Sequence, residues 1–120
     1  MHNDVEMVED CVFCKIVAGE VPGQKIHEDA KVIAISDINP VAPVHVLIIP
    51  KKHLGKLEML NEEEMEVAGY CFQIAPVVAR AKKILNEGYR LVLNQGENAG
   101  QELDHLHLHL LAGRNLKGMG

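Results

Sequence analysis

The stretch that decides the fold of this chain is His105-Leu106-His107-Leu108-His109-Leu110-Leu111, in which histidine and leucine alternate. Successive side chains of a β-strand point to opposite faces, so a strand here places the histidines on one face and the leucines on the other. A helix would spread both residue types around its axis and form no clean stripe of either. We therefore predict a strand over 105–111, with its leucines in the core and its imidazoles at a site.

The residues alone leave three interpretations of this imidazole face open. Histidine is tolerated on a solvent-facing strand edge, and histidines two apart on a strand can share a tetrahedral zinc ion. Imidazole also titrates near neutral pH and is a competent nucleophile, which suits acid–base or nucleophilic catalysis. The preceding loop, residues 94–101, is rich in glycine and amide side chains. Its backbone N–H groups could approach an anion closely, although the same composition suits a hairpin turn.

Length and composition narrow the class of protein. A chain of 120 residues with 48% hydrophobic and 24% charged residues is typical of one globular domain. The net charge of −5 argues against a nucleic-acid partner. Residues 1–10 are acidic and polar, so we expect a flexible N-terminal arm rather than a secretory signal. With no apolar run of membrane-spanning length, we expect a cytoplasmic protein with no membrane partner.

Hydrophobic periodicity predicts the remaining elements. A short helix is expected over 11–18 and a long helix from Asn61, a good N-cap, to about residue 85. Pro76 should kink or interrupt that helix near Ile74. Strands are expected over 25–29, 31–37, 44–50, 89–94 and 105–111. This order predicts an α+β fold with a mostly antiparallel sheet.

Two isolated residues add detail to this picture. His45 is the single polar residue inside the apolar stretch 44–50. A lone histidine there is usually a satisfied core residue, but a strand neighbouring 105–111 would make it a fourth imidazole at the same place. Cys71 lies in the apolar part of the long helix, and we expect it to be buried filling.

Several further motifs accompany the histidine stretch. They are Cys11-Val12-Phe13-Cys14, Asp37-Ile38-Asn39-Pro40, Ala42-Pro43-Val44-His45, Ile49-Pro50-Lys51-Lys52-His53, Asn94, Gly100-Gln101 and Ala112-Gly113-Arg114. With these motifs, and with a match to the pattern His-φ-His-φ-His-φ-φ (φ, apolar), the chain resembles the Hint branch of the histidine triad (HIT) family. The resemblance implies a HIT domain over 11–114, a C-terminal tail over 115–120, and a five-stranded sheet that extends across a homodimer.

The resemblance also implies an activity and a ligand. Members of this branch bind purine nucleotides and cleave the P–N bond of purine nucleoside 5′-phosphoramidates through a covalent nucleotidyl-histidine intermediate. Carried over by position, His107 is the nucleophile, His109 binds the phosphate or leaving group, and His45 completes a proton relay with the row that begins at His105. The residues implied to bind the nucleotide besides His107 and His109 are Phe13, Ile16, Val21, Ile35, Asp37, Ile38, Asn94, Gly100, Gln101 and Glu102. Among these, Asp37 is expected at the ribose hydroxyls, and Glu102 is expected to point outward and offer only its backbone N–H.

Relatives that keep the Cys-x-x-Cys pair bind zinc, and the ligands implied here are Cys11, Cys14, His53 and His105. A Cys2His2 set closes a tetrahedral site, so this zinc would be structural. The alternative is two small buried residues on a helical turn. Three rival functions remain: a dinucleoside polyphosphate hydrolase, a nucleotide-binding regulatory module with little catalysis, and a zinc hydrolase that uses all three histidines of the row.

Overall fold

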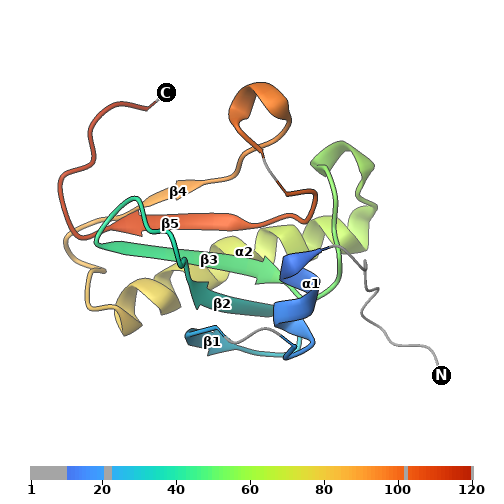
Figure 1. Ribbon diagram of the computed structural model, residues 1–120, viewed down its shortest axis with the longest axis horizontal. Coiled ribbons are helices and arrows are strands. Elements are labelled where there is room, and N and C mark those ends of the chain that lie inside the picture. The colour runs from blue at the N-terminus through green and yellow to red at the C-terminus, as the bar shows by residue number, and fades with distance from the viewer. Residues whose placement is uncertain (1–10, 21–22, 102, 120) are drawn as a thin grey trace.

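The computed structural model describes residues 11–20, 23–101 and 103–119, and it confirms the α+β prediction (Figure 1). Its helices and strands are α1 (Val12–Val17), β1 (Lys25–Glu28), β2 (Val32–Ser36), β3 (Val44–Pro50), α2 (Glu62–Ala81), β4 (Arg90–Val92) and β5 (Leu108–Ala112). The five strands form one antiparallel sheet in the order β1-β2-β3-β5-β4. None of the described helices is long and apolar enough to cross a membrane. The predicted arm over 1–10, Val21 and Glu102 lie outside the described residues.

The two helices cover opposite faces of the sheet (Figure 1). The long helix α2 packs on Val32, Ala34, Val46, Ile48, Leu108 and Leu110. The short helix α1 packs on the residues of β2 and β3 that point to the other face, which are Ile33, Ile35, Leu47 and Ile49. Because β2 and β3 are buried on both faces, they are apolar at nearly every position rather than alternating.

Helix α2 starts as predicted but ends differently. The Asn61 side chain accepts from a backbone N–H in the first turn, as expected for an N-cap. The helix then runs without interruption through Pro76 and ends at Ala81, so Pro76 does not interrupt it near Ile74, and the predicted end at residue 85 is wrong. Lys83, with φ of 61°, turns the chain out of the helix. The buried residues that hold the helix on the sheet beside the proline are Ile74, Ala75, Val78 and Ala79.

Strand β5 begins at Leu108 rather than at residue 105, which corrects the prediction of a paired strand over the whole histidine row. Residues 105–107 precede the ladder, and Leu106 is held by a hydrogen bond from its N–H to the carbonyl of Leu54 (2.6 Å). The side-chain alternation nevertheless persists, because the leucines at 106, 108 and 110 are all buried. Strand β4 is likewise shorter than the predicted strand over 89–94.

Candidate active site and metal centre

A cleft of about 550 Å³ opens on the face of the sheet that carries α1. The predicted site residues that line it are Phe13, Ile16, Ile35, Asp37, Ile38, His45, Asn94, Gly100, His107 and His109. It is also lined by Val12, Gly23, Ser36, Asn39, Val41, Leu47 and Leu103, which the sequence reasoning did not single out. Several of these are chain neighbours of predicted residues, and that adjacency was the only signal available for them.

Strand pairing brings two of the histidines together. In the register of β3 with β5, His45 lies opposite Leu111 and His109 lies opposite Leu47. His45 and His109 are therefore diagonal neighbours on one face, a spacing that long or aromatic side chains can bridge. The Nε2 atom of His45 lies 2.9 Å from Nδ1 of His109. This confirms the expectation that the polar interruption in the apolar strand adds an imidazole to the row.

A chain of hydrogen bonds defines which nitrogen of each ring carries the proton. The backbone N–H of Val41 donates to Nδ1 of His45 (3.2 Å), so a neutral His45 must carry its proton on Nε2. That Nε2–H donates to Nδ1 of His109, which places the proton of His109 on its own Nε2. Nε2 of His109 is buried and has no hydrogen-bond partner in the described part of the chain. This N–H therefore lacks an acceptor, and an oxygen of a bound anion would supply one.

Burial keeps both rings of this pair neutral near pH 7. The pKa of His109 is lowered to about 4, mainly by burial and also by the neighbouring rings of His107 and His45, while the charge of Asp37 acts in the opposite direction. Burial also lowers the pKa of His45, although the carboxylate of Asp37, 3.4 Å away, acts in the opposite direction. Each neutral ring therefore holds one proton, on its Nε2.

The ring of His107 is oriented by a hydrogen bond at its Nδ1. Its Nδ1 lies 2.7 Å from the carbonyl oxygen of His105, so Nδ1 carries the proton and Nε2 keeps a lone pair. The ring lies 4.8 Å from the ring of Phe13 and 4.9 Å from the ring of His109, measured between centroids. The cleft therefore holds a nitrogen lone pair on His107 beside an N–H donor on His109, the pair that attack on an electrophilic phosphorus requires.

The loop before β5 contributes to the cleft only in part. Asn94 and Gly100 line it, and Gly100 adopts a φ of 85° that favours glycine. The side chain of Gln101 instead closes its own loop, accepting from the N–H of Gly96 (2.7 Å) and donating to the carbonyl of Leu103 (3.1 Å). The geometry thus gives Gln101 a role in shaping the loop.

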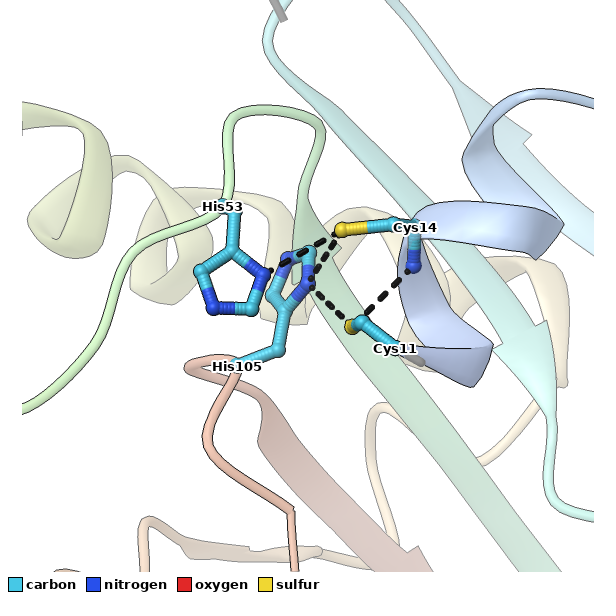
Figure 2. A group of neighbouring side chains, drawn as sticks. All are labelled: Cys11, Cys14, His53 and His105. Carbon is cyan, nitrogen blue, oxygen red and sulfur yellow. Dashed lines mark hydrogen bonds between the residues drawn. The ribbon is translucent and has the colours of Figure 1, made fainter. Parts of the chain in front are cut away.

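The residues implied as zinc ligands converge on a single point (Figure 2). Sγ of Cys11 and Nδ1 of His105 are 3.2 Å apart, and Sγ of Cys14 lies 3.2 Å from Nδ1 of His53 and 3.5 Å from Nδ1 of His105. The four donor atoms all lie within 4.8 Å of one another. Tetrahedral zinc, with Zn–S near 2.3 Å and Zn–N near 2.05 Å, places its sulfur and nitrogen ligands about 3.5 Å apart. Both the donor set and its spacing fit this ion.

His105 belongs to this cluster and not to the cleft. Its ring is fully buried, and its Nε2–H donates to the carbonyl of Pro50 (2.9 Å), which leaves the lone pair of Nδ1 facing the two sulfurs. Such an outer hydrogen bond is the usual way to orient a metal-binding imidazole. The expected row of three histidines is therefore divided, with His107 and His109 in the cleft and His105 in the cluster.

Comparison with known proteins agrees with this geometry. The HIT domain family matches residues 18–116. The chain is 37% identical over 113 residues to the purine nucleoside phosphoramidase of Escherichia coli (strain K12), covering 94% of this chain and 95% of that protein. It is 44% identical over 107 residues to a 14 kDa zinc-binding protein of Zea mays, covering 88% and 83%. The solved structure of a HIT family hydrolase from Clostridium thermocellum superimposes with a TM-score of 0.89 at 46% identity, covering 94% of this chain and 98% of that one. On this evidence, and with the histidine row in place, the chain belongs to the HIT domain family.

Proposed function

We propose that the protein hydrolyses the P–N bond of purine nucleoside 5′-phosphoramidates through a nucleotidyl-His107 intermediate. The observation that carries this proposal is the pair of oriented nitrogens in the cleft, an unprotonated Nε2 on His107 beside a protonated Nε2 on His109. The relative from Escherichia coli that is named a purine nucleoside phosphoramidase supports it.

The proposed reaction has two steps. Nε2 of His107 attacks the α-phosphorus, and the bond from phosphorus to the amine breaks, so the amine leaves with the electron pair and takes a proton from water. A second water then attacks phosphorus, the bond to His107 breaks, and the proton released returns to solvent. In both steps the Nε2–H of His109 donates to a phosphate oxygen on which charge accumulates. His45 keeps that N–H in place through its bond to Nδ1.

The rest of the cleft suits a nucleotide. The Asp37 carboxylate accepts the N–H of Asn39 through Oδ1 (2.8 Å) and retains acceptor capacity for the ribose hydroxyls. Asn94 and Gly100 also line the cleft, and we assign them to the phosphate. The apolar wall for the base consists of Phe13, Ile16, Ile35 and Ile38. Of these, Ile38 is 88% exposed at the rim and can cover the outer face of a bound base.

We also propose that Cys11, Cys14, His53 and His105 hold a structural zinc ion, because they supply four ligands and no open position. The zinc-binding relative from Zea mays supports the choice of metal. Elemental analysis of protein purified without a His tag, with thiols kept reduced, should find near-stoichiometric zinc. A clearly substoichiometric content after zinc supplementation would contradict this proposal.

A homodimer is proposed as the assembled form. Helix α2 exposes Met65, Phe72 and Val77, at 44%, 47% and 40%, and we assign these apolar side chains to the interface. Light scattering on the purified protein should give twice the mass of the chain, and a mass of one chain at micromolar concentration would contradict it.

The activity is tested by replacing the proposed nucleophile. His107→Ala should abolish turnover of adenosine 5′-phosphoramidate while AMP still binds, because the other groups of the cleft remain. His27→Gln is the matched control, since His27 lies outside the cleft and should not affect turnover. Full turnover by His107→Ala would contradict the role of this residue.

The same assay separates the rival functions. A phosphoramidate should be a better substrate than a diadenosine polyphosphate, and the reverse order would favour a dinucleoside polyphosphate hydrolase. Tight AMP binding with no turnover of either substrate by the wild-type protein would favour a regulatory module. A zinc hydrolase built on all three histidines is disfavoured by the position of His105, whose ring faces away from the cleft into the cysteine pair.

A further inference from the structure

His105 physically connects the metal cluster to the proposed nucleophile. Its Nδ1 faces the sulfurs of Cys11 and Cys14, at 3.2 and 3.5 Å. Its backbone carbonyl accepts the Nδ1–H of His107 at 2.7 Å, the bond that leaves Nε2 of His107 unprotonated. The segment that carries this carbonyl precedes β5 and is not fixed by the sheet ladder. The peptide unit that contains this carbonyl is anchored by the bond from Leu106 N–H to Leu54, and the ring of His105, held by Pro50 and by the cluster, is its second anchor.

Phe13 makes a second connection. It lies between the two cysteines on α1, is 5% exposed, and places its ring 5.7 Å from that of His105 and 4.8 Å from that of His107. Helix α1 has only six residues, too few to be stable on its own. Its position depends on packing against the sheet and on the two cysteines that enter the cluster (Figure 2).

We propose that the cluster of Cys11, Cys14, His53 and His105, with its metal bound, is a positioning site for catalysis. Through His105 it fixes the tautomer and position of His107, and through α1 it holds the apolar wall of the nucleotide cleft. Metal occupancy then sets the catalytic competence of the protein as well as its stability. This inference rests on the proposed phosphoramidase activity and on the proposed zinc.

The expected effect is large because catalysis depends steeply on geometry. Without a metal, the ring of His105 keeps its hydrogen bond to the carbonyl of Pro50 but loses the bond that fixes its Nδ1, and its carbonyl can shift. A misplacement of the reacting group by about 1 Å can cost on the order of 100-fold in rate. We therefore expect kcat to fall at least tenfold in metal-free protein, and AMP affinity to weaken by a smaller factor as α1 loosens.

Two buried cysteines provide a matched pair of variants. Cys14 and Cys71 are both fully buried, but Cys71 lies on α2, on the opposite face of the sheet from the cluster. Cys14→Ala should lose zinc, lower kcat at least tenfold, and convert the ¹⁵N NMR signals of His107 from a single Nδ1–H tautomer to a mixture. Cys71→Ala should keep the zinc content, the tautomer and kcat of the wild type.

Two further samples keep the test decisive if Cys14→Ala does not fold. His53→Ala removes a ligand whose described contacts are with Cys14 and His105. Wild-type protein freed of zinc by a chelator can be reloaded with zinc alone. Both metal-free forms should show the mixed tautomer, and reloading should restore the single one. An unchanged tautomer and kcat in folded metal-free protein would overturn the proposal, as would the absence of zinc binding or the unfolding of every metal-free form. If the wild type shows no turnover, the phosphoramidase assignment fails, while the tautomer still decides the coupling.

Discussion

Replacement of His45 tests whether the hydrogen-bond chain on the sheet face controls the donor in the cleft. His45 is 7% exposed, and its Nε2–H is the donor that fixes the proton of His109 on the Nε2 facing the cleft. In His45→Leu the Nδ1 of His109 loses this partner and is left buried. Without that donor, nothing fixes the proton of His109 on Nε2, and the tautomer with the proton on Nδ1 becomes populated. In that tautomer the lone pair of Nε2 would repel the phosphate oxygens.

The magnitude follows from the lost bond. A buried polar group left without its partner costs about 1–3 kcal/mol, and each 1.4 kcal/mol of transition-state stabilisation is worth about tenfold in rate. We therefore expect His45→Leu to lower kcat/KM for adenosine 5′-phosphoramidate by about 10- to 100-fold. ¹⁵N NMR of His109 should show the accompanying change of tautomer.

His45→Gln is the conservative control, because its side-chain amide can reach the position of Nε2 and donate to His109. It should retain kcat/KM within about fivefold of the wild type, because a hydrogen bond that is made with poorer geometry costs less than about 1 kcal/mol. Equal losses in the two variants would show that ring packing, not the N–H, is what His45 contributes. Full activity in His45→Leu would refute the positioning role.

Two predictions concern stability away from the cleft. Burial would raise the pKa of Asp29, but hydrogen bonds from His27, Tyr70 and two backbone N–H groups outweigh it and lower the pKa. Asp29 therefore adds stability above the pH at which it titrates in the unfolded chain. Below about pH 4, the urea midpoint of the wild type should fall more steeply with pH than that of Asp29→Asn. Parallel curves for the two proteins would contradict this reasoning. Gly113 has a φ of 97° and an added Cβ would lie 2.8 Å from Cβ of Pro43, so Gly113→Ala should lower the free energy of unfolding by more than about 1 kcal/mol. Gly69→Ala, inside α2 with nothing within 4 Å, should instead raise it by about 0.5–1 kcal/mol, and the same sign for both would contradict the reasoning.

The long helix shows where pattern and packing diverge. The N-cap at Asn61 was predictable because capping depends on residues a few positions apart. Continuity through Pro76 was not, since an interior proline costs about 3 kcal/mol by itself. Four buried side chains that flank the proline hold the helix on the sheet and outweigh that cost. Local rules fail where tertiary contacts of this size oppose them.

The candidate site also combines features that could be predicted from the sequence with features that could not. Its residue types were visible in the sequence, but the amide that orients His45 belongs to Val41, and a backbone N–H has no sequence signature. Gln101 was grouped with the nucleotide-binding residues because of its place in a motif, whereas its side chain bonds within its own loop. The direction of a flexible side chain depends on partners that only the folded loop brings near.

The two-residue alternation of the histidine row, its place in a sheet and the candidate phosphate and metal ligands could all be predicted from the sequence. These features follow from periodicity and chemical type, which are local properties of the chain. The resemblance implied that His105 joins the cysteines, and the folded chain shows the geometry of that division, with His105 turned to the cysteines and His107 and His109 turned to the cleft. Only the tertiary structure decided which nitrogen of each ring carries the proton. The reason is physical, because a ring's orientation and tautomer are set by hydrogen-bond partners that only the folded backbone brings into place, such as the carbonyl of Pro50 for His105 and the carbonyl of His105 for His107.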